Sequence, residues 1–139
     1  MEKRKSWLGI LAVVLVFGVM IIGCKDEEYP AELKVTNSTS VGITLVEFRD
    51  SGIVIKSDNV TIPAGQSKNY ELNSDFYGSI KIVLSPLGIP VVECIISNVT
   101  LYPGYEKSGK SGGKLKPSKK ELLVSGNVLS GFELSIIDL

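Results

Sequence analysis

The chain has 139 residues, with 15 basic and 15 acidic side chains and no histidine. The balanced charge predicts no general attraction to nucleic acid. The absence of histidine excludes histidine-based catalytic triads and removes the commonest side-chain ligand of transition metals.

The first 24 residues combine a charged head, an apolar run and a cysteine. Residues 2–5 read Glu-Lys-Arg-Lys, and residues 7–23 carry no charge. A basic head followed by an apolar middle is typical of a secretory signal peptide, which is removed from the mature protein. We therefore assign residues 1–23 to a signal peptide and exclude them from the folded domain.

The apolar run ends in Ile21-Ile22-Gly23-Cys24, which resembles the lipobox of bacterial lipoproteins. In that family the cysteine thiol receives a diacylglyceryl group, and the chain is cut before it. The resemblance implies that Cys24 is lipidated and anchors the protein in a membrane of the bacterial cell envelope. Each methylene buried in the membrane contributes about 0.8 kcal/mol to the free energy of binding, so two or three acyl chains give a stable anchor. Two alternatives stay open, an uncleaved transmembrane helix and an ordinary secreted protein.

Residues 24–30 form the lipidated cysteine and a polar tether. Lys25-Asp26-Glu27-Glu28 looks like the acidic export tag that sends some lipoproteins of Bacteroidota to the cell surface. The resemblance implies an outer-membrane or surface location. The alternative is a solvated spacer between lipid and domain.

From Ala31 onward, short apolar segments alternate with turn residues, as in β-strands. Val41, Ile43 and Leu45 are expected on one face of a strand. Ile80, Ile82 and Leu84 are expected on one face of another. The predicted strands cover residues 33–36, 41–48, 53–55, 60–62, 70–72, 79–84, 91–101, 121–125 and 132–136. Turns are expected at residues 50–52, 63–66 and 85–90, where glycine or proline interrupts the pattern.

This pattern predicts an all-β domain over residues 31–139, a single antiparallel β-sandwich of about 7–9 strands that follows an N-terminal apolar signal helix. Residues 103–120 are expected to form a loop rich in lysine, glycine and serine. Residues 60–67 and 100–104 look like the strand-turn-strand pieces of small immunoglobulin-like or transthyretin-like domains in bacterial surface lipoproteins. That resemblance implies the architecture and carries no catalytic residue.

Six lysines fall within 14 residues of the predicted loop, with no acidic residue among them. They are Lys107, Lys110, Lys114, Lys116, Lys119 and Lys120. The plainest interpretation is a solvated hairpin tip. The alternative is a contact with acidic glycan, an anionic surface or an envelope protein.

Other motifs do not favour an enzyme. Residues 104–111 match the P-loop pattern, but the glycines and proline that follow forbid the helix that the motif needs. Lipidation of Cys24 leaves Cys94 without a disulfide partner. Because Cys94 lies in an apolar predicted strand, we expect it to be a small hydrophobic residue of the core. The carboxylate pairs Glu47 with Asp50 and Glu71 with Asp75 are expected to be solvated. We predict no catalytic residue, metal or cofactor.

The sequence thus favours a lipid-anchored, monomeric binding or adhesion module. The alternative is an accessory envelope lipoprotein that packs on a partner protein, and an enzyme is a remote third. Exposed apolar side chains gathered in one place would favour packing on a partner. A polar surface with the lysines at one end would favour adhesion.

Overall fold

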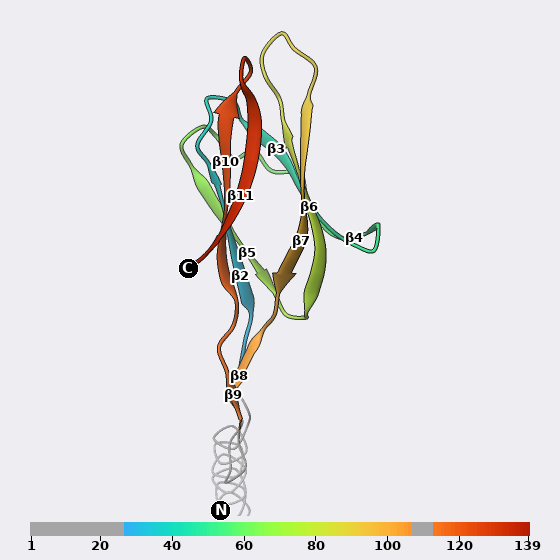
Figure 1. Cartoon of the computed structure of the whole chain (residues 1–139), viewed down its shortest axis with the longest axis vertical. Coiled ribbons are helices and arrows are strands. Elements are labelled where there is room, and N and C mark those ends of the chain that lie inside the picture. The colour runs from blue at the N-terminus through green and yellow to red at the C-terminus, as the bar shows by residue number, and fades with distance from the viewer. Residues whose placement is uncertain (1–26, 107–112) are drawn as a thin grey trace, which may run out of the picture. The chain divides into compact units, whose positions relative to one another are not determined.

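The computed structural model describes residues 27–106 and 113–139, and all regular structure in these residues is β-strand (Figure 1). This confirms the predicted all-β class. No helix in the described residues is long and apolar enough to span a membrane. The expected signal peptide, Cys24, Lys107 and Lys110 lie outside the described residues.

The larger of two units spans Tyr29–Gly104 and Lys116–Leu139 and contains two four-stranded sheets. The first sheet has the order β11-β10-β2-β5, and the second has the order β4-β3-β6-β7. In the first sheet the strands are β2 (Ala31–Asn37), β5 (Ser67–Leu72), β10 (Lys119–Asn127) and β11 (Gly131–Asp138). In the second they are β3 (Ile43–Asp50), β4 (Ile53–Asp58), β6 (Phe76–Leu84) and β7 (Val92–Leu101).

The two sheets share one hydrophobic core. Phe48 on β3 packs edge-on against Tyr70 on β5, with ring centroids 5.6 Å apart, and against Phe76 on β6 at 5.7 Å. Such edge-to-face pairs add about 0.5–1.5 kcal/mol beyond their buried area. The predicted inner face of Ile80, Ile82 and Leu84 is confirmed, since all three are fully buried.

The β3–β4 hairpin forms as predicted. Ser51 and Gly52 connect the strands with positive φ angles of 51° and 80°. Two successive left-handed residues are the signature of the tight turn whose twist matches that of paired strands. The turn at residues 63–66 also has its expected glycine, because Gly65 has a φ of 78°.

The prediction that Val41, Ile43 and Leu45 share one face of a strand is wrong for Leu45. A register irregularity between Ile43 and Leu45 shifts the phase of β3 against β6. Consequently Val46 and Phe48 are fully buried, whereas Leu45 is only half-buried. A single extra residue moves every later side chain to the opposite face.

The sheets are not wholly antiparallel, because β2 and β10 pair in parallel. Strand β7 ends near the place where β2 begins, and β10 is the next strand of the same unit along the chain (Figure 1). Ser118 ties the connection there: its amide donates to the Tyr102 carbonyl, and its own carbonyl accepts from the Glu32 amide, both at 2.9 Å. Strand β10 must therefore start beside the start of β2 and run in the same direction.

The smaller unit differs from the expected 103–120 loop. Its described residues are 27–28, 105–106 and 113–115. Strands β1 (Glu27–Tyr29), β8 (Gly104–Glu106) and β9 (Lys114–Leu115) form a three-stranded sheet in the order β1-β8-β9. Tyr105 and Leu115 face each other across the antiparallel β8–β9 pair. Part of the expected loop is therefore an antiparallel strand pair, whereas residues 107–112 lie outside the described residues.

Candidate functional site

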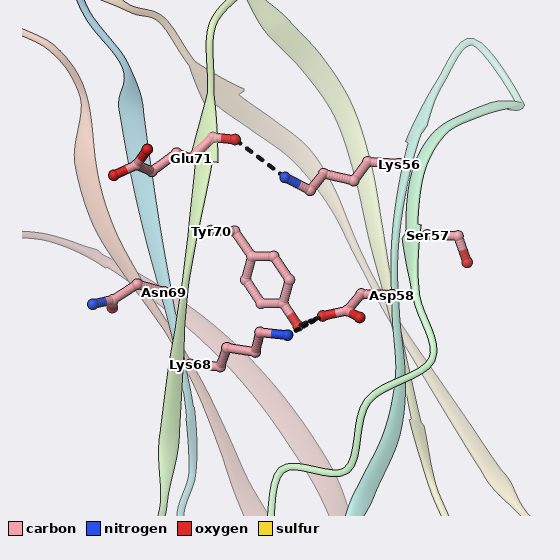
Figure 2. Close-up of a pocket in the computed structure, with 7 residues that line it drawn as sticks. All are labelled: Lys56, Ser57, Asp58, Lys68, Asn69, Tyr70 and Glu71. Atoms are coloured by element: carbon pink, nitrogen blue, oxygen red, sulfur yellow. Dashed lines mark hydrogen bonds and ion pairs between the residues drawn. The ribbon is translucent and has the colours of Figure 1, made fainter.

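An open cleft of about 480 Å³ lies between β4 and β5, each of which is an edge strand of its sheet (Figure 2). Its lining residues come from those two strands. They are Lys56, Ser57, Asp58, Lys68, Asn69, Tyr70 and Glu71.

Asp58 is the centre of the polar contacts in this cleft. Its Oδ2 atom accepts a hydrogen bond from the Tyr70 hydroxyl at 2.8 Å and pairs with Lys68 Nζ at 2.7 Å. Lys56 Nζ reaches across from β4 to donate to the Glu71 carbonyl at 3.2 Å. Figure 2 shows these groups converging from the two strands.

The cleft's electrostatics follow from these contacts. The hydrogen bond from Lys68 holds the pKa of Asp58 below its usual value. Burial, together with the Asp58 carboxylate, raises the pKa of Tyr70. The amines of Lys56 and Lys68 also lie over the Tyr70 ring, 5.8 Å and 5.4 Å from its centroid. Tyr70 is therefore held as a neutral donor to an ionised Asp58.

This arrangement links the two sheets more readily than it binds a ligand. Each lysine amine already has a partner on the opposite strand, and the lining carries two acidic and two basic side chains. Inward-pointing charges on an edge strand also discourage pairing with another chain's edge. We therefore interpret the polar contacts around Asp58 as structural: they hold β4 and β5 together at this side of the core.

A second, smaller hollow of about 250 Å³ is found beside the β3–β4 turn. Its lining includes Arg49, Tyr77 and Asn98, so both an aromatic ring and polar groups are available there. Tyr77 is 62% exposed.

Apolar side chains are exposed in two turns of the larger unit, which we call the apolar tips. They are Leu87, Ile89 and Val91 in the β6–β7 turn, and Val128 and Leu129 in the β10–β11 turn. Leu87 is 100% exposed and Leu129 is 99% exposed. Both turns lie at the end of the unit opposite Ala31, where β2 begins (Figure 1). The strands that follow them, β7 and β11, contact each other.

The predicted lysine cluster is only partly described, and its members differ in surroundings. Lys114 lies in β9, within the smaller unit. Lys116 precedes β10 and is exposed. Lys119 and Lys120 belong to β10, where they approach Glu32 at 3.8 Å and Asp138 at 3.6 Å. The last two lysines are therefore strand residues with acidic neighbours.

The other residues considered in the sequence analysis lie in places where their contacts belong to the fold. Cys94 is half-buried against the core, and burial raises the pKa of its thiol. The expectation that Glu47 is solvated is wrong: its side chain is buried, at 8% exposed, and its carboxylate accepts a hydrogen bond from Arg49 on the same strand. Asn37 is fully buried. In residues 27–106 and 113–139, no group of three or more acidic, cysteine or histidine side chains is placed to hold a metal ion.

Sequence reasoning did not find the Asp58, Lys68 and Tyr70 cluster or the Arg49 hollow. Their members come from different strands, and nothing in the local pattern indicates which edges meet. The apolar tips could be found from the sequence: Leu87 and Leu129 are large apolar residues in segments whose glycine, proline, serine and asparagine residues indicate turns. Comparisons with protein-family models, curated proteins and solved structures found no match to the chain.

Proposed function

We propose that this protein is a lipid-anchored lipoprotein of the bacterial envelope whose domain is a non-catalytic, immunoglobulin-like or transthyretin-like β-sandwich that docks on a partner protein. The anchor is supported by the lipobox-like ending at Cys24. The sandwich is supported by two four-stranded sheets around a common core. The non-catalytic role is supported by a chain without histidine.

The apolar tips carry the docking proposal. Residues 84–92 and 125–132 contain no charged side chain, and each segment presents a leucine that is almost completely exposed. Large apolar side chains gathered in one region of a surface are typical of interaction sites. Fully exposed leucines gain the most from contact, because burying one contributes about 1.5–3 kcal/mol.

The position of the tips also suits a tethered protein. The chain enters the unit at the start of β2, and the tips lie at the other end (Figure 1). A protein anchored through residues before β2 would thus present the tips away from its entry point. A partner protein is favoured over an acidic surface because the tips carry no basic residue.

The docking proposal can be tested with the full-length protein extracted from cells in mild detergent. Wild-type protein is expected to elute from a sizing column in a complex larger than the lone protein in its micelle. The Leu87→Ser/Leu129→Ser variant is expected to elute alone. The Ile53→Ser/Val54→Ser variant, which removes exposed apolar side chains from β4, serves as the matched control and should keep the complex. Elution of the wild type alone would contradict docking and favour adhesion.

The anchor has a separate test. Cys24→Ser should abolish lipidation and move the protein out of the detergent phase in Triton X-114 partitioning. A Cys24→Ser protein that stays in the membrane with its N-terminus intact would instead indicate a transmembrane helix.

A further inference from the structure

The hollow beside the β3–β4 turn has features that the docking proposal does not use. Tyr77 and Ser79 line it and alternate along β6 with the buried Phe76 and Ile80. Because successive strand residues point to opposite faces, the hollow lies on the side of the sheet away from the core. It is therefore open to a ligand from solvent.

Two irregularities of the sheet meet at this hollow. The β3–β4 register shifts between Phe48 and Arg49, and the β6–β7 register shifts between Gly78 and Ile80. Asn98 has a φ of 59°, a left-handed conformation that is uncommon outside glycine. Bulges of this kind re-aim side chains and recur next to binding sites. Here they put residues from three strands and one turn around a single depression.

The hollow carries little net charge. Arg49 is the only basic residue among those that line the hollow. The Arg49 guanidinium is paired with the buried carboxylate of Glu47. An anionic ligand would have to compete with that carboxylate for the guanidinium. The remaining guanidinium N–H groups can still donate hydrogen bonds to neutral oxygen atoms.

The other lining groups suit a ligand rich in hydroxyls. The hydroxyls of Ser79 and Ser97 belong to lining residues of the hollow, and each can both donate and accept a hydrogen bond. The Asn98 amide oxygen accepts a long 3.4 Å bond from the Tyr77 hydroxyl, which leaves the amide nitrogen available. Tyr77 supplies an exposed aromatic ring beside them. A purely apolar ligand would leave these polar groups unsatisfied.

We propose that this hollow binds one sugar unit of a neutral polysaccharide. A pyranose ring has an apolar C–H face, which can pack on the Tyr77 ring, and a rim of hydroxyls, which can bond to Ser79, Ser97 and Asn98. The volume of about 250 Å³ is slightly below the range of about 300–1,000 Å³ for drug-sized ligands. It therefore fits a single unit, and the rest of a glycan chain extends into solvent.

A glycan array tests the proposal with the full-length protein in detergent. The array carries neutral oligosaccharides of glucose, mannose, galactose and N-acetylglucosamine, alongside carboxylated and sulfated glycans. The wild type is expected to bind at least one neutral glycan, in a manner that salt hardly affects. Tyr77→Ala and Asn98→Gly are each expected to raise the Kd for that glycan about tenfold or more. Glycine accepts the left-handed backbone, so Asn98→Gly removes the amide without straining the bulge.

Two controls separate the hollow from other surfaces. Tyr102→Ala removes another exposed tyrosine of the same unit and should leave binding unchanged. Leu87→Ser/Leu129→Ser should also retain glycan binding, because the hollow is independent of the apolar tips. The proposal is overturned if no neutral glycan binds, if only acidic glycans bind, or if Tyr77→Ala and Asn98→Gly bind as well as the wild type.

Discussion

Asp58 on β4 and Tyr70 on β5 are joined by a 2.8 Å hydrogen bond between the edge strands of the two sheets. The same carboxylate oxygen pairs with Lys68, and the Tyr70 ring packs against Phe48 in the core. One acidic side chain thus holds a buried ring and a lysine from the opposite sheet.

Replacing Asp58 by Asn should destabilise the domain modestly at neutral pH. The pair is partly exposed, so we expect a loss of about 0.5–1 kcal/mol in the free energy of unfolding, measured by urea denaturation. Because the folded-state pKa of Asp58 is lowered, its contribution is present above the unfolded value of about 3.9 and is lost as the pH falls through the folded value. The difference between wild type and Asp58→Asn should therefore shrink as the pH falls below about 4 and disappear below the folded-state pKa of Asp58. A difference that persists in acid would show that the charge of Asp58 is not responsible.

Gly78→Ala should be strongly destabilising. A Cβ atom at Gly78 would lie 1.9 Å from the Arg49 carbonyl oxygen, so the backbones of β6 and β3 would have to move apart. We expect a loss of about 3 kcal/mol, the upper end of the usual cost of overpacking. Gly42→Ala is the matched control, because its Cβ would make only an ordinary 3.8 Å contact with Thr61. Equal melting temperatures for the two variants would contradict the close approach.

Asn37→Ala should also destabilise the domain. The buried Asn37 amide donates to the carbonyls of Val41 and Ile62 at 2.7 Å and 3.0 Å, and its oxygen accepts from Thr39. Removing it deletes these hydrogen bonds and takes the Asn37 acceptor from the buried amide and hydroxyl of Thr39, at a cost of about 1–3 kcal/mol. Asn59→Ala, at an exposed position, should unfold like the wild type. A melting temperature unchanged by Asn37→Ala would mean that water or another side chain replaces the amide.

Changing the six lysines of residues 107–120 to glutamine should leave thermal stability nearly unchanged. The two ion pairs described there, Lys119 with Glu32 and Lys120 with Asp138, are long and solvent-exposed on at least one side. Such pairs contribute little to folding. If the segment contacts an anionic surface, the same variant should also lose salt-sensitive binding to anionic lipid vesicles. Equal, salt-insensitive vesicle binding by both proteins would leave these lysines as solvated residues.

The strands and turns could be predicted because local chemistry specifies them. Period-two alternation placed Ile80, Ile82 and Leu84 in the core, and Ser51-Gly52 indicated the hairpin turn. A bulge leaves no such signal, because one extra residue changes the phase without changing composition. Leu45 was therefore placed on the wrong face. The parallel β2–β10 pair and the Asp58–Tyr70 bond depend on which strands meet across the domain, and the local pattern does not contain that information.

Site-specific photocrosslinking in intact cells tests the proposed docking most directly. A photoreactive amino acid is placed at Leu129, at an apolar tip, or at Ile53, an exposed position on β4. The account predicts that position 129 crosslinks to one discrete protein, that position 53 does not, and that Leu87→Ser weakens the crosslink at position 129. Crosslinking that is absent at position 129, or equal at both positions and insensitive to Leu87→Ser, would contradict docking through the apolar tips.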